Sequence, residues 1–411
     1  GVSADERDHG GAAGAGNADR RGNVQARRAA GAVRTDLGDK MRYLQLEECC
    51  EILDSLRIPI TASDRKAGPY PYYGANGIQD YVADFIFDDE LVLLAEDGGN
   101  FGSKTRPIAY RVSGKFWVNN HAHVLKPKRN IVDVDYLCYS LMFYNTEELV
   151  NGATRQKLTQ AAMRKMLIPE QPIRVQEKIV AELKTIQAII SARQQQLQKL
   201  DELVKARFVE MFGSISNNVH GYEVKTLQEV CSQIKDGTHQ TPIYTEDREK
   251  GVKFLSSKDV TSGKIDWSNI KYIPAELHEE LYARIKPQRG DILLAKNGTT
   301  GVAAVVDTDE VFDIYVSLAL LRPIAINPVY LWAAVNSIDT KHQFDRSLKG
   351  IGVPNLHLGE IKKTKIIIPP METQVEFENF CNQIDKSKAI ILSSLSKTQL
   401  LFESLMQEYF G

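Results

Sequence analysis

The longest uninterrupted helical pattern in the chain runs from Ile173 to Gly213, and it constrains the fold more than any other feature. Apolar residues recur in it at steps of mostly three and four, which places them along one face of a helix. They are Ile179, Leu183, Ile186, Ile190, Leu197, Leu200, Val204, Phe208 and Met211. Pro172 and Gly213 are typical helix boundaries. At about 1.5 Å per residue the helix would be roughly 50–60 Å long, so its apolar face needs a partner.

A second stretch, Met371 to Gly411, repeats the first at a constant distance along the chain. When the first stretch is moved forward by 198 positions, Gln176 falls on Gln374. The same shift continues upstream of the helices and matches Leu158 with Leu356. Such a constant offset indicates an internal duplication of about 200 residues, which is far longer than a solenoid repeat. The chain is therefore predicted to contain two copies of a globular module followed by a helix.

The order module, helix, module, helix determines how the two helices can pair. The first helix would leave module one and reach module two, and the second would have to run back for the apolar faces to meet. The sequence thus predicts an α+β fold with two similar mixed α/β globules, related by a pseudo-two-fold axis. Between them, two long helices would form an antiparallel coiled coil. Such a spacer would suit DNA half-sites separated by about one helical turn, roughly 34–36 Å.

The chain divides into five predicted segments. These are residues 1–40, module one at 41–172, the first spacer helix at 173–213, module two at 214–370 and the second spacer helix at 371–411. Residues 1–40 are rich in Gly, Ala, Arg and Asp and cannot form a core, so we expect a disordered tail. A native start at Met41, after an upstream fusion or expression remnant, is our interpretation of that tail.

Module one is expected to open with a helix at Leu46 to Leu53, followed by a turn-rich segment with a tight turn at Asn76-Gly77. Later helices are expected at Asp133 to Asn145 and at Leu158 to Met166. Between them lie short apolar runs typical of strands. These runs are Phe85 to Phe87, Leu91 to Ala95, Ile108 to Val112, Phe116 to Val118 and His123 to Leu125.

Module two repeats this plan with different polar residues. The sequence LLAKNG at Leu293 to Gly298 echoes LLAEDG at Leu93 to Gly98. Corresponding helices are expected at Leu227 to Ile234 and at Leu331 to Ile338. One shared apolar pattern with two sets of loop residues predicts two related but distinct targets.

Composition restricts the class of protein. The 411 residues allow two or three domains, and the chain has no run of eighteen apolar residues that would cross a membrane. Its five Cys residues form no C-x-x-C motif and no signal peptide is evident, so we expect reduced thiols and a cytoplasmic location. The net charge of −2 excludes a global attraction to nucleic acid, so any such binding must use local patches or partners.

The ordered set of motifs in both modules resembles the specificity subunit of type I restriction-modification systems. The motifs that carry the resemblance are DELVLLAEDG (Asp89 to Gly98), WVNNHAHVLKP (Trp117 to Pro127), KDGTHQTPIY (Lys235 to Tyr244), RGDILLAKNGTTG (Arg289 to Gly301), YPYYGANGIQDYV (Tyr70 to Val82) and the connections from Gly152 to Gln176 and from Gly350 to Gln374. The resemblance extends over nearly all of residues 41–411. The 40-residue tail matches nothing in that family.

The resemblance implies a DNA reader without catalytic residues of its own. Each module would recognise one half of a split double-stranded DNA sequence, and the helices would separate the halves by an unread spacer. The helices would also dock two methylation subunits, which carry the S-adenosylmethionine, and restriction subunits would join them. The chain itself is expected to bind no cofactor and no metal.

Polar and aromatic loop residues are the candidates for DNA contacts, since major-groove geometry favours Arg or Lys to guanine and Asn or Gln to adenine. In module one they are Tyr72, Tyr73, Asn76, Lys104, Arg106, Asn119, Asn120 and His121; in module two, Thr238, His239, Gln240, Lys258, Lys296, Asn297, Thr299 and Thr300. Next to the Gly152 and Gly350 turns, Arg155, Lys157 and Lys349 are candidates for phosphate contacts. For each residue a solvated loop or a phosphate contact stays open beside base reading.

Two other classes of function stay open from the sequence. A cryptic DNA-cleaving enzyme is disfavoured, because Glu182-Leu183-Lys184 lies within the predicted helix and Pro369-Pro370 is followed by Met371 rather than an aromatic residue of a methyltransferase motif. A metal site at His121 and His123 lacks Cys or carboxylate companions at ligand spacing. A coiled-coil adaptor that reads no DNA sequence is the remaining alternative.

Overall fold

The computed structural model describes residues 42–152, 156–260, 263–298, 300–348 and 355–411. The chain separates into two compact units, one of residues 1–189 with 398–411 and the other of residues 190–397. Each unit therefore combines one globular module with part of each long helix.

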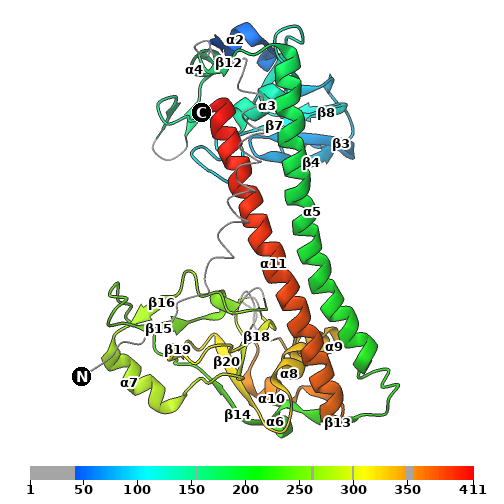
Figure 1. The fold of residues 1–411 in the computed structure, drawn as a ribbon, viewed down its shortest axis with the longest axis vertical. Helices are drawn as coiled ribbons and strands as arrows, with labels where there is room; N and C mark the ends of the chain where they lie inside the picture. The colour runs from blue at the N-terminus through cyan, green and yellow to red at the C-terminus, as the bar shows by residue number, and fades with distance from the viewer. Residues whose placement is uncertain (1–41, 153–155, 261–262, 299, 349–354) are drawn as a thin grey trace, which may run out of the picture. The chain divides into compact units, whose positions relative to one another are not determined.

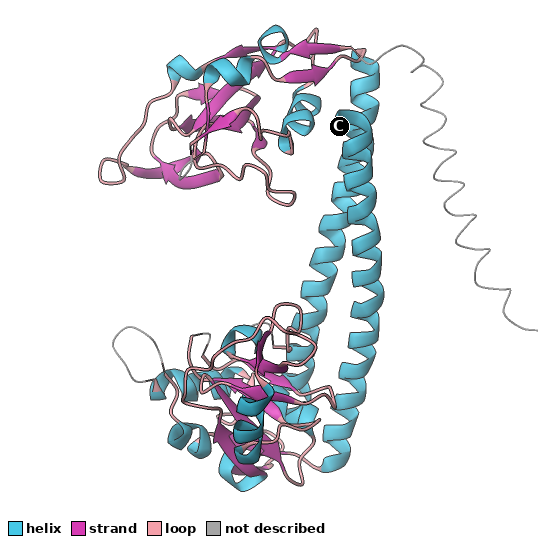
Figure 2. Cartoon of the chain, turned by 90° about the vertical axis from the view of Figure 1, so that its left-hand side faces the viewer, coloured by secondary structure: helices cyan, strands magenta, loops and turns pink. Residues whose placement is uncertain are grey.

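The two long helices are α5 (Ile173–Phe212) and α11 (Met371–Phe410), and both helix predictions are confirmed. In each unit a stretch of α5 lies beside a stretch of α11 (Figure 1 and Figure 2). In the first unit, the hydroxyl of Tyr409 donates a hydrogen bond to Glu182 over 2.7 Å. In the second unit, the rings of Phe208 and Phe377 lie 5.6 Å apart. The start of α5 thus meets the end of α11 and its end meets the start of α11, which is the predicted antiparallel coiled coil.

Burial follows the predicted apolar face. Leu183 and Ile186 are buried in the first unit, and Val204 is buried in the second. The remaining predicted positions on α5 are buried or half-buried. In the second unit, α11 places Phe377 and Ile384 in the same apolar cluster as Val204. The helices therefore use the stripe that the sequence indicates.

Module one contains two four-stranded sheets. Its elements are β1 (Tyr43–Gln45), α2 (Leu46–Cys49), β2 (Cys50–Ile52), η2 (Asp54–Leu56), β3 (Ala67–Gly74), β4 (Gly77–Val82), β5 (Phe87–Asp88), β6 (Leu91–Ala95), β7 (Ala109–Val112), β8 (Lys115–Val118), β9 (Ala122–Pro127), α3 (Val134–Met142), β10 (Val150–Asn151), β11 (Lys157–Leu158), α4 (Gln160–Arg164) and β12 (Leu167–Pro169). One sheet has the order β2-β9-β6-β7 and is antiparallel throughout; the other has the order β4-β3-β8-β5. Strand β12 pairs with β1 and leads directly into α5.

Module two repeats the first sheet with the order β14-β20-β17-β18, and a three-stranded sheet β16-β15-β19 accompanies it. Its elements are β13 (Glu223–Thr226), α6 (Leu227–Val230), β14 (Cys231–Asp236), β15 (Val252–Leu255), η3 (Ser257–Val260), β16 (Lys271–Ile273), α7 (Ala275–Arg284), β17 (Ile292–Ala295), β18 (Ala303–Val305), β19 (Phe312–Ile314), β20 (Leu318–Pro323), α8 (Pro328–Val335), α9 (Ile338–Ser347), α10 (Leu358–Lys363) and β21 (Lys365–Ile368). Strand β21 pairs with β13 and leads into α11, as β12 leads into α5.

The opening helix of each module is shorter than predicted, and the same physical reason applies in both. Helix α2 ends at Cys49 and helix α6 at Val230, after a single turn closed by a capping box. The following residues become β2 and β14, because each pairs with a central strand of the main sheet. Strand pairing therefore overrides the helical pattern in the second half of each predicted helix.

Several other predictions need correction. The segment read as turn-rich forms the hairpin β3–β4, with the predicted turn at Asn76-Gly77 and a φ of 109° at Gly77. The helix predicted from Leu158 is the strand β11 followed by the short α4. The helix predicted at Leu331 to Ile338 begins earlier as α8 and ends at Val335, and α9 follows it.

A buried glutamine fastens each long helix to its module. Gln176 is 2% exposed and accepts a hydrogen bond from the backbone of Asp133 over 2.8 Å, while its amide group donates to the Ile131 carbonyl. Gln374 is 1% exposed and accepts from the backbone of Asn327, also over 2.8 Å. Asp133 and Asn327 are the N-cap residues of α3 and α8, so the same contact recurs in both modules.

Across the part of the chain that the structure describes, no helix combines the length and the hydropathy needed to cross a bilayer.

We expect Gln374→Leu to destabilise module two, because it leaves the Asn327 N–H and the Pro369 carbonyl buried without their partner. Each unpaired group costs about 1–3 kcal/mol, so the free energy of unfolding should fall by at least about 2 kcal/mol. Urea unfolding followed by circular dichroism measures it. The matched control is Gln198→Leu at an exposed position of α5, where we expect less than about 0.5 kcal/mol. Equal effects of both substitutions would contradict the role of the buried contact.

Candidate nucleic-acid interface

One end of each main sheet gathers the loops that carry most of the candidate residues. In module one, β2 and β6 end there and β9 begins there, as the antiparallel pairing of β9 with both strands requires. In module two, β14 and β17 end and β20 begins at the corresponding end. The sheet thus presents the chain segments after two strands and before a third on the same side of the module.

In module one, several candidates meet around the turn after β6. The side chain of Asn76 donates to the carbonyl of Gly98 over 3.0 Å. The Nδ1 atom of His121 lies 2.6 Å from a carboxylate oxygen of Asp97. Asn120 is exposed beside His121. The structure therefore brings together residues from the β3–β4 hairpin, the loop after β6 and the start of β9.

The loop between β6 and β7 carries Lys104 and Arg106, both exposed. The backbone N–H of Arg106 donates to the hydroxyl of Ser103 over 2.9 Å, which shapes the loop locally. Tyr73 is half-buried, with its ring 5.8 Å from that of Phe116. Lys104 and Arg106 are thus the cationic candidates of module one with free access to a ligand.

Module two places its candidates at the equivalent loops. His239 and Gln240 are exposed after β14, and Lys258 is exposed on η3. Asn297 is half-buried after β17, and its side-chain oxygen has no hydrogen-bond partner among the described residues. Thr300 is half-buried close to it, with its hydroxyl donating to the carbonyl of Gly298.

Four candidates lie too deep to touch DNA in this conformation. Tyr72 is 1% exposed and accepts a hydrogen bond from the backbone of Ile60, so it is a core residue. Asn119 is 3% exposed, Thr238 is 7% exposed and Lys296 is 6% exposed. The prediction overlooked that their polar groups have partners within the module, which lets them be buried. Their contribution to recognition would have to be indirect.

Three candidates, Arg155, Thr299 and Lys349, lie outside the described residues. Lys157 is described and exposed, and its ammonium group lies 3.0 Å from a carboxylate oxygen of Glu96.

Backbone hydrogen bonds show which positions of the two modules are equivalent. The N–H of Glu96 donates to His121 and its carbonyl accepts from Leu158. The N–H of Lys296 likewise donates to Ser317, and its carbonyl accepts from Leu356. Strand register adds a further match, since Leu94 lies opposite His123 and Leu294 lies opposite Ala319. Glu96 therefore corresponds to Lys296, and His123 to Ala319.

A buried charge cluster lies beneath the loops of module one. The carboxylate of Asp54 lies 2.6 Å from Nδ1 of His123 and also accepts from the backbone of Val124 and the side chain of Gln160. Burial alone would raise the pKa of Asp54, but the hydrogen bond and charge of His123 hold it below its ordinary value. Nε2 of His123 lies 2.9 Å from the carbonyl of Leu158. Because the carbonyl of Leu158 can only accept, Nε2 carries the hydrogen of that bond.

The second acid of this cluster is Glu96, which Arg57 and Lys157 neutralise. A guanidinium nitrogen of Arg57 lies 2.5 Å from Glu96, and another lies 3.5 Å from Asp54. Burial raises the pKa of Glu96, yet the hydrogen bonds from Arg57 and Lys157 leave it below its ordinary value. The cluster thus holds two acids, whose pKa values are lowered, against the cationic side chains of Arg57 and Lys157.

Asp54, Glu96 and His123 could in geometric terms hold a metal ion, since their ligand atoms lie within 4.8 Å of one another. The sequence prediction missed these carboxylates, because Asp54 is 69 positions from His123. Their surroundings argue against a metal, because Arg57 already occupies the space beside both acids and a dication would add uncompensated buried charge. The two ring nitrogens of His123 also already lie at hydrogen-bond distance from Asp54 and from the carbonyl of Leu158.

Module two also pairs a buried aspartate, Asp236, but uses fewer residues to do so. Asp236 lies 3.1 Å from the ammonium of Lys296, 3.1 Å from Nε2 of His239 and 3.2 Å from a guanidinium nitrogen of Arg284. Burial would raise the pKa of Asp236, but the hydrogen bond and charge of Lys296 lower it. In module two, the ion pair between Asp236 and Lys296 takes the place of the module-one cluster formed by Asp54, Arg57, Glu96, His123 and Lys157.

The sequence analysis did not select Asp54 or Asp236 as functional residues. A signal was present, because each lies a few residues after a cysteine that begins a strand, Cys50 of β2 and Cys231 of β14. Module two reaches its aspartate one residue later because of an irregularity between Cys231 and Gln233.

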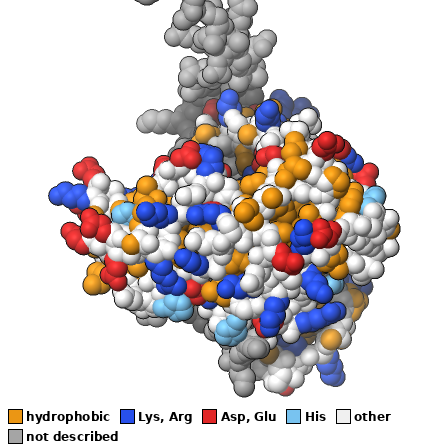
Figure 3. Space-filling model, turned by 90° about the horizontal axis from the view of Figure 1, so that it is seen from below, with side chains coloured by type: hydrophobic (Ala, Val, Ile, Leu, Met, Phe, Trp, Pro, Cys, Tyr) orange, Lys and Arg blue, Asp and Glu red, His pale blue; other side chains and the backbone are white. Residues whose placement is uncertain are grey.

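Surface charge is mixed. On the face drawn in Figure 3, Lys and Arg side chains are interspersed with Asp and Glu rather than gathered into one continuous field. This distribution agrees with the net charge of −2 and points to local cationic contacts.

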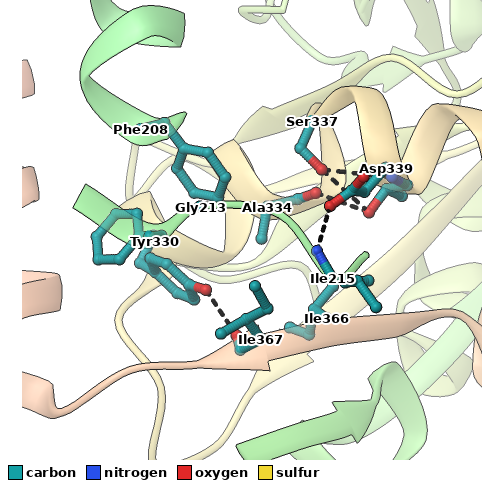
Figure 4. Close-up of a pocket in the computed structure, with 11 residues that line it drawn as sticks. Phe208, Gly213, Ile215, Tyr330, Ala334, Ser337, Asp339, Ile366 and Ile367 are labelled. Atoms are coloured by element: carbon teal, nitrogen blue, oxygen red, sulfur yellow. Dashed lines mark hydrogen bonds between the residues drawn. The ribbon is translucent and has the colours of Figure 1, made fainter. Parts of the chain in front are cut away.

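A small hollow where α5 joins module two has a structural explanation. Figure 4 shows Phe208 and Tyr330 beside it, and a carboxylate oxygen of Asp339 accepting from the backbone of Ile215 over 2.6 Å. The hydroxyl of Tyr330 donates to the carbonyl of Ile367. The residues around the hollow thus fasten the chain as it leaves the helix, and their polar groups are already paired.

Comparison with known proteins gives a consistent result. A family model described as the type I restriction modification DNA specificity domain matches residues 39–202 and again residues 220–400. A putative type I restriction enzyme specificity subunit of Haemophilus influenzae is 27% identical over 393 residues, covering 90% of this chain and 96% of that protein. The MjaVIII specificity subunit of Methanocaldococcus jannaschii is 23% identical over 380 residues, covering 85% of each chain.

Solved structures show the same fold. The S subunit of a type I restriction-modification system from M. genitalium aligns with a TM-score of 0.53 at 13% identity, covering 91% of this chain and 98% of that one. A chain from a study of type I R-M complex assembly also aligns with a TM-score of 0.53, at 15% identity, covering 90% and 99%. With two matches to the family model that together span most of its length, the chain belongs to the type I restriction-modification DNA specificity family.

Proposed function

We propose that this chain is the sequence-reading subunit of a type I restriction-modification complex and reads a bipartite double-stranded DNA site. The observation that carries the proposal is the pair of modules with one backbone scaffold and different polar groups at equivalent loop positions, such as Glu96 and Lys296. A shared main sheet with different loop chemistry suits the reading of two different half-sites. The exposed Lys104 and Arg106 of module one and His239, Gln240 and Lys258 of module two are the groups we place against DNA.

In this proposal the chain performs no chemistry itself. Two methylation subunits bring S-adenosylmethionine and the transfer of its methyl group, and restriction subunits bring cleavage. The chain contributes position, because it holds the complex at one sequence. Its low net charge suits a division of labour in which partners supply many of the phosphate contacts.

The long helices are the surfaces we assign to the partner subunits. Helix α11 leaves Ile390 72% exposed and Leu400 61% exposed, and α5 leaves Val209 53% exposed. Apolar side chains at such exposure are costly in a free helix pair and suit contact with a further protein.

Long-read methylome sequencing of the host with and without the gene tests the proposed function. We expect methylation of one two-part motif to disappear on deletion and to return when the gene is restored. If no two-part motif loses its methylation, the chain does not direct methylation in that host. Replacing residues 42–172 with the module of a relative should change one half of the motif; an adaptor that reads no sequence would leave both halves unchanged.

We expect Arg106→Ala to weaken recognition of one half-site. If Arg106 reads a base, discrimination at one position should fall by about 1–3 kcal/mol; if it contacts a phosphate, affinity should fall uniformly and the salt dependence should lose about one charge. Binding of the assembled complex to variant duplexes at several salt concentrations separates the two roles. The control is Arg129→Ala, an exposed arginine beyond the other end of β9 that pairs with Glu90. A loss no larger than that of the control would remove Arg106 from the interface.

We expect Ile390→Lys to weaken binding of the methylation subunits roughly tenfold or more, because it places a charge in the proposed apolar contact. Stability of the free chain should change by less than about 0.5 kcal/mol, since the side chain is exposed. Titration of the chain with purified methylation subunit measures the affinity. Gln399→Lys adds the same charge at an exposed polar position of α11 and should leave binding unchanged. Undiminished binding of the Ile390 variant would exclude this part of α11 from docking.

A further inference from the structure

The charge cluster of module one lies where three DNA-facing segments begin. Asp54 and Arg57 follow β2, Glu96 is the first residue after β6, and His123 lies in β9 just after the Asn119–His121 segment. Ion pairs and hydrogen bonds of 2.5–3.7 Å link their side chains. A change in the cluster would therefore be felt at the base of each of these segments.

The cluster also fastens a fourth segment. The chain from Gln156 to Leu158 lies against the turn after β6, with backbone hydrogen bonds from Leu158 to Glu96 and from Gly98 to Gln156. The side chain of Lys157 bonds Glu96, and the carbonyl of Leu158 receives the Nε2 hydrogen of His123. Glu96 and His123 therefore hold this segment through side chains as well as through the backbone.

Because the chain is internally duplicated, the residues at three equivalent positions can be compared between the two modules. Module one has Asp54, Glu96 and His123, and module two has Asp236, Lys296 and Ala319. The aspartate is common to both. In module one, the residue after β6 is the acid Glu96 and the neighbouring strand β9 carries His123. In module two, the residue after β17 is the cation Lys296 and the equivalent position of β20 is Ala319. The two positions thus change together in a way that keeps the buried aspartate paired.

We infer that Glu96 and His123 act jointly as positioning residues that set the geometry of the recognition loops of module one, as Lys296 does in module two. The strands form without any one of these side chains in particular, because both modules make the same backbone hydrogen bonds with different side chains at these positions. A buried ionic group is a weak source of stability but fixes one arrangement of its neighbours, since any displacement leaves a charge unpaired. The inference rests on the proposed function, in which these loops face DNA.

The test replaces Glu96 and His123 of module one with the residues found at the equivalent positions of module two. Glu96→Lys alone places a third cationic side chain beside Arg57 and Lys157 with only Asp54 left to balance them, and His123→Ala alone leaves Asp54 without its closest partner. The double variant Glu96→Lys/His123→Ala reproduces the Asp236, Lys296 and Ala319 set. The control is Glu90→Lys, a half-buried acid of the same module whose side chain is 46% exposed and pairs with Arg111 and Arg129. Each variant is expressed in the host, and methylation of the two-part motif and of its single-base variants is measured.

We expect each single variant to lower methylation of the cognate motif about tenfold or to relax preference in one half only, with the other half unchanged. The double variant should recover to within about threefold of wild type, and the control should match wild type. A fold-stabilising role alone would lower the amount of active complex without altering the sequence preference of what remains. Thermal unfolding of each purified variant separates that case, and Glu96→Gln, which keeps the side-chain shape, carries the same expectation if Glu96→Lys does not fold.

Three results would overturn the inference. They are single variants with wild-type methylation, equal loss of preference in both halves, and a double variant no better than the product of the two single effects. Failure of the proposed function is a separate outcome, because the unaltered chain would then direct no methylation to a two-part motif.

Discussion

A forty-residue amphipathic helix cannot bury its apolar face alone, and the arrangement of this chain follows from that constraint. Each unit answers it locally, because the module and both helix stretches share one core. In the second unit, Phe377 of α11 joins Phe208 and Phe212 of α5 around Tyr330 of the module. The helices are thus part of each module's core, and the buried glutamine at the start of each one fixes its entry by hydrogen bonds that a sliding helix could not keep.

Within each module, the residues that form the core are distinct from the polar residues at the strand ends. Core positions stay apolar in both copies, as the match of Leu158 with Leu356, both fully buried, illustrates. The strand ends carry the polar groups, and there the copies differ even in the sign of charge. Since backbone hydrogen bonds hold those ends in one geometry, the side chains are free to differ provided that each buried charge keeps a partner. The scaffold is therefore compatible with many sets of loop residues.

Patterns with many repeated contacts could be predicted from the sequence, and sites built from single distant contacts could not. The long helices, the strand at Leu91 to Ala95 and the hairpin turn at Asn76-Gly77 all have local signatures, and the structure confirms them. The burial of Lys296 had no local signature, because a lysine after a strand usually lies in solvent and its partner Asp236 is 60 positions away. The candidates were chosen as polar loop residues. They therefore include both exposed residues and buried residues such as Lys296.

The same distinction explains how a chain of net charge −2 can serve as a DNA reader. In module two, Asp236 lies beside the two cations Lys296 and Arg284 and beside the ring of His239, so two cations face one buried acid at the strand ends. Of these, Lys296 is buried, while His239 and Arg284 have side chains 66% and 49% exposed. A buried acid beneath exposed cationic side chains fixes the direction in which they point. It also neutralises part of the positive charge that they present to a ligand. Such an arrangement favours discrimination between sequences over raw affinity.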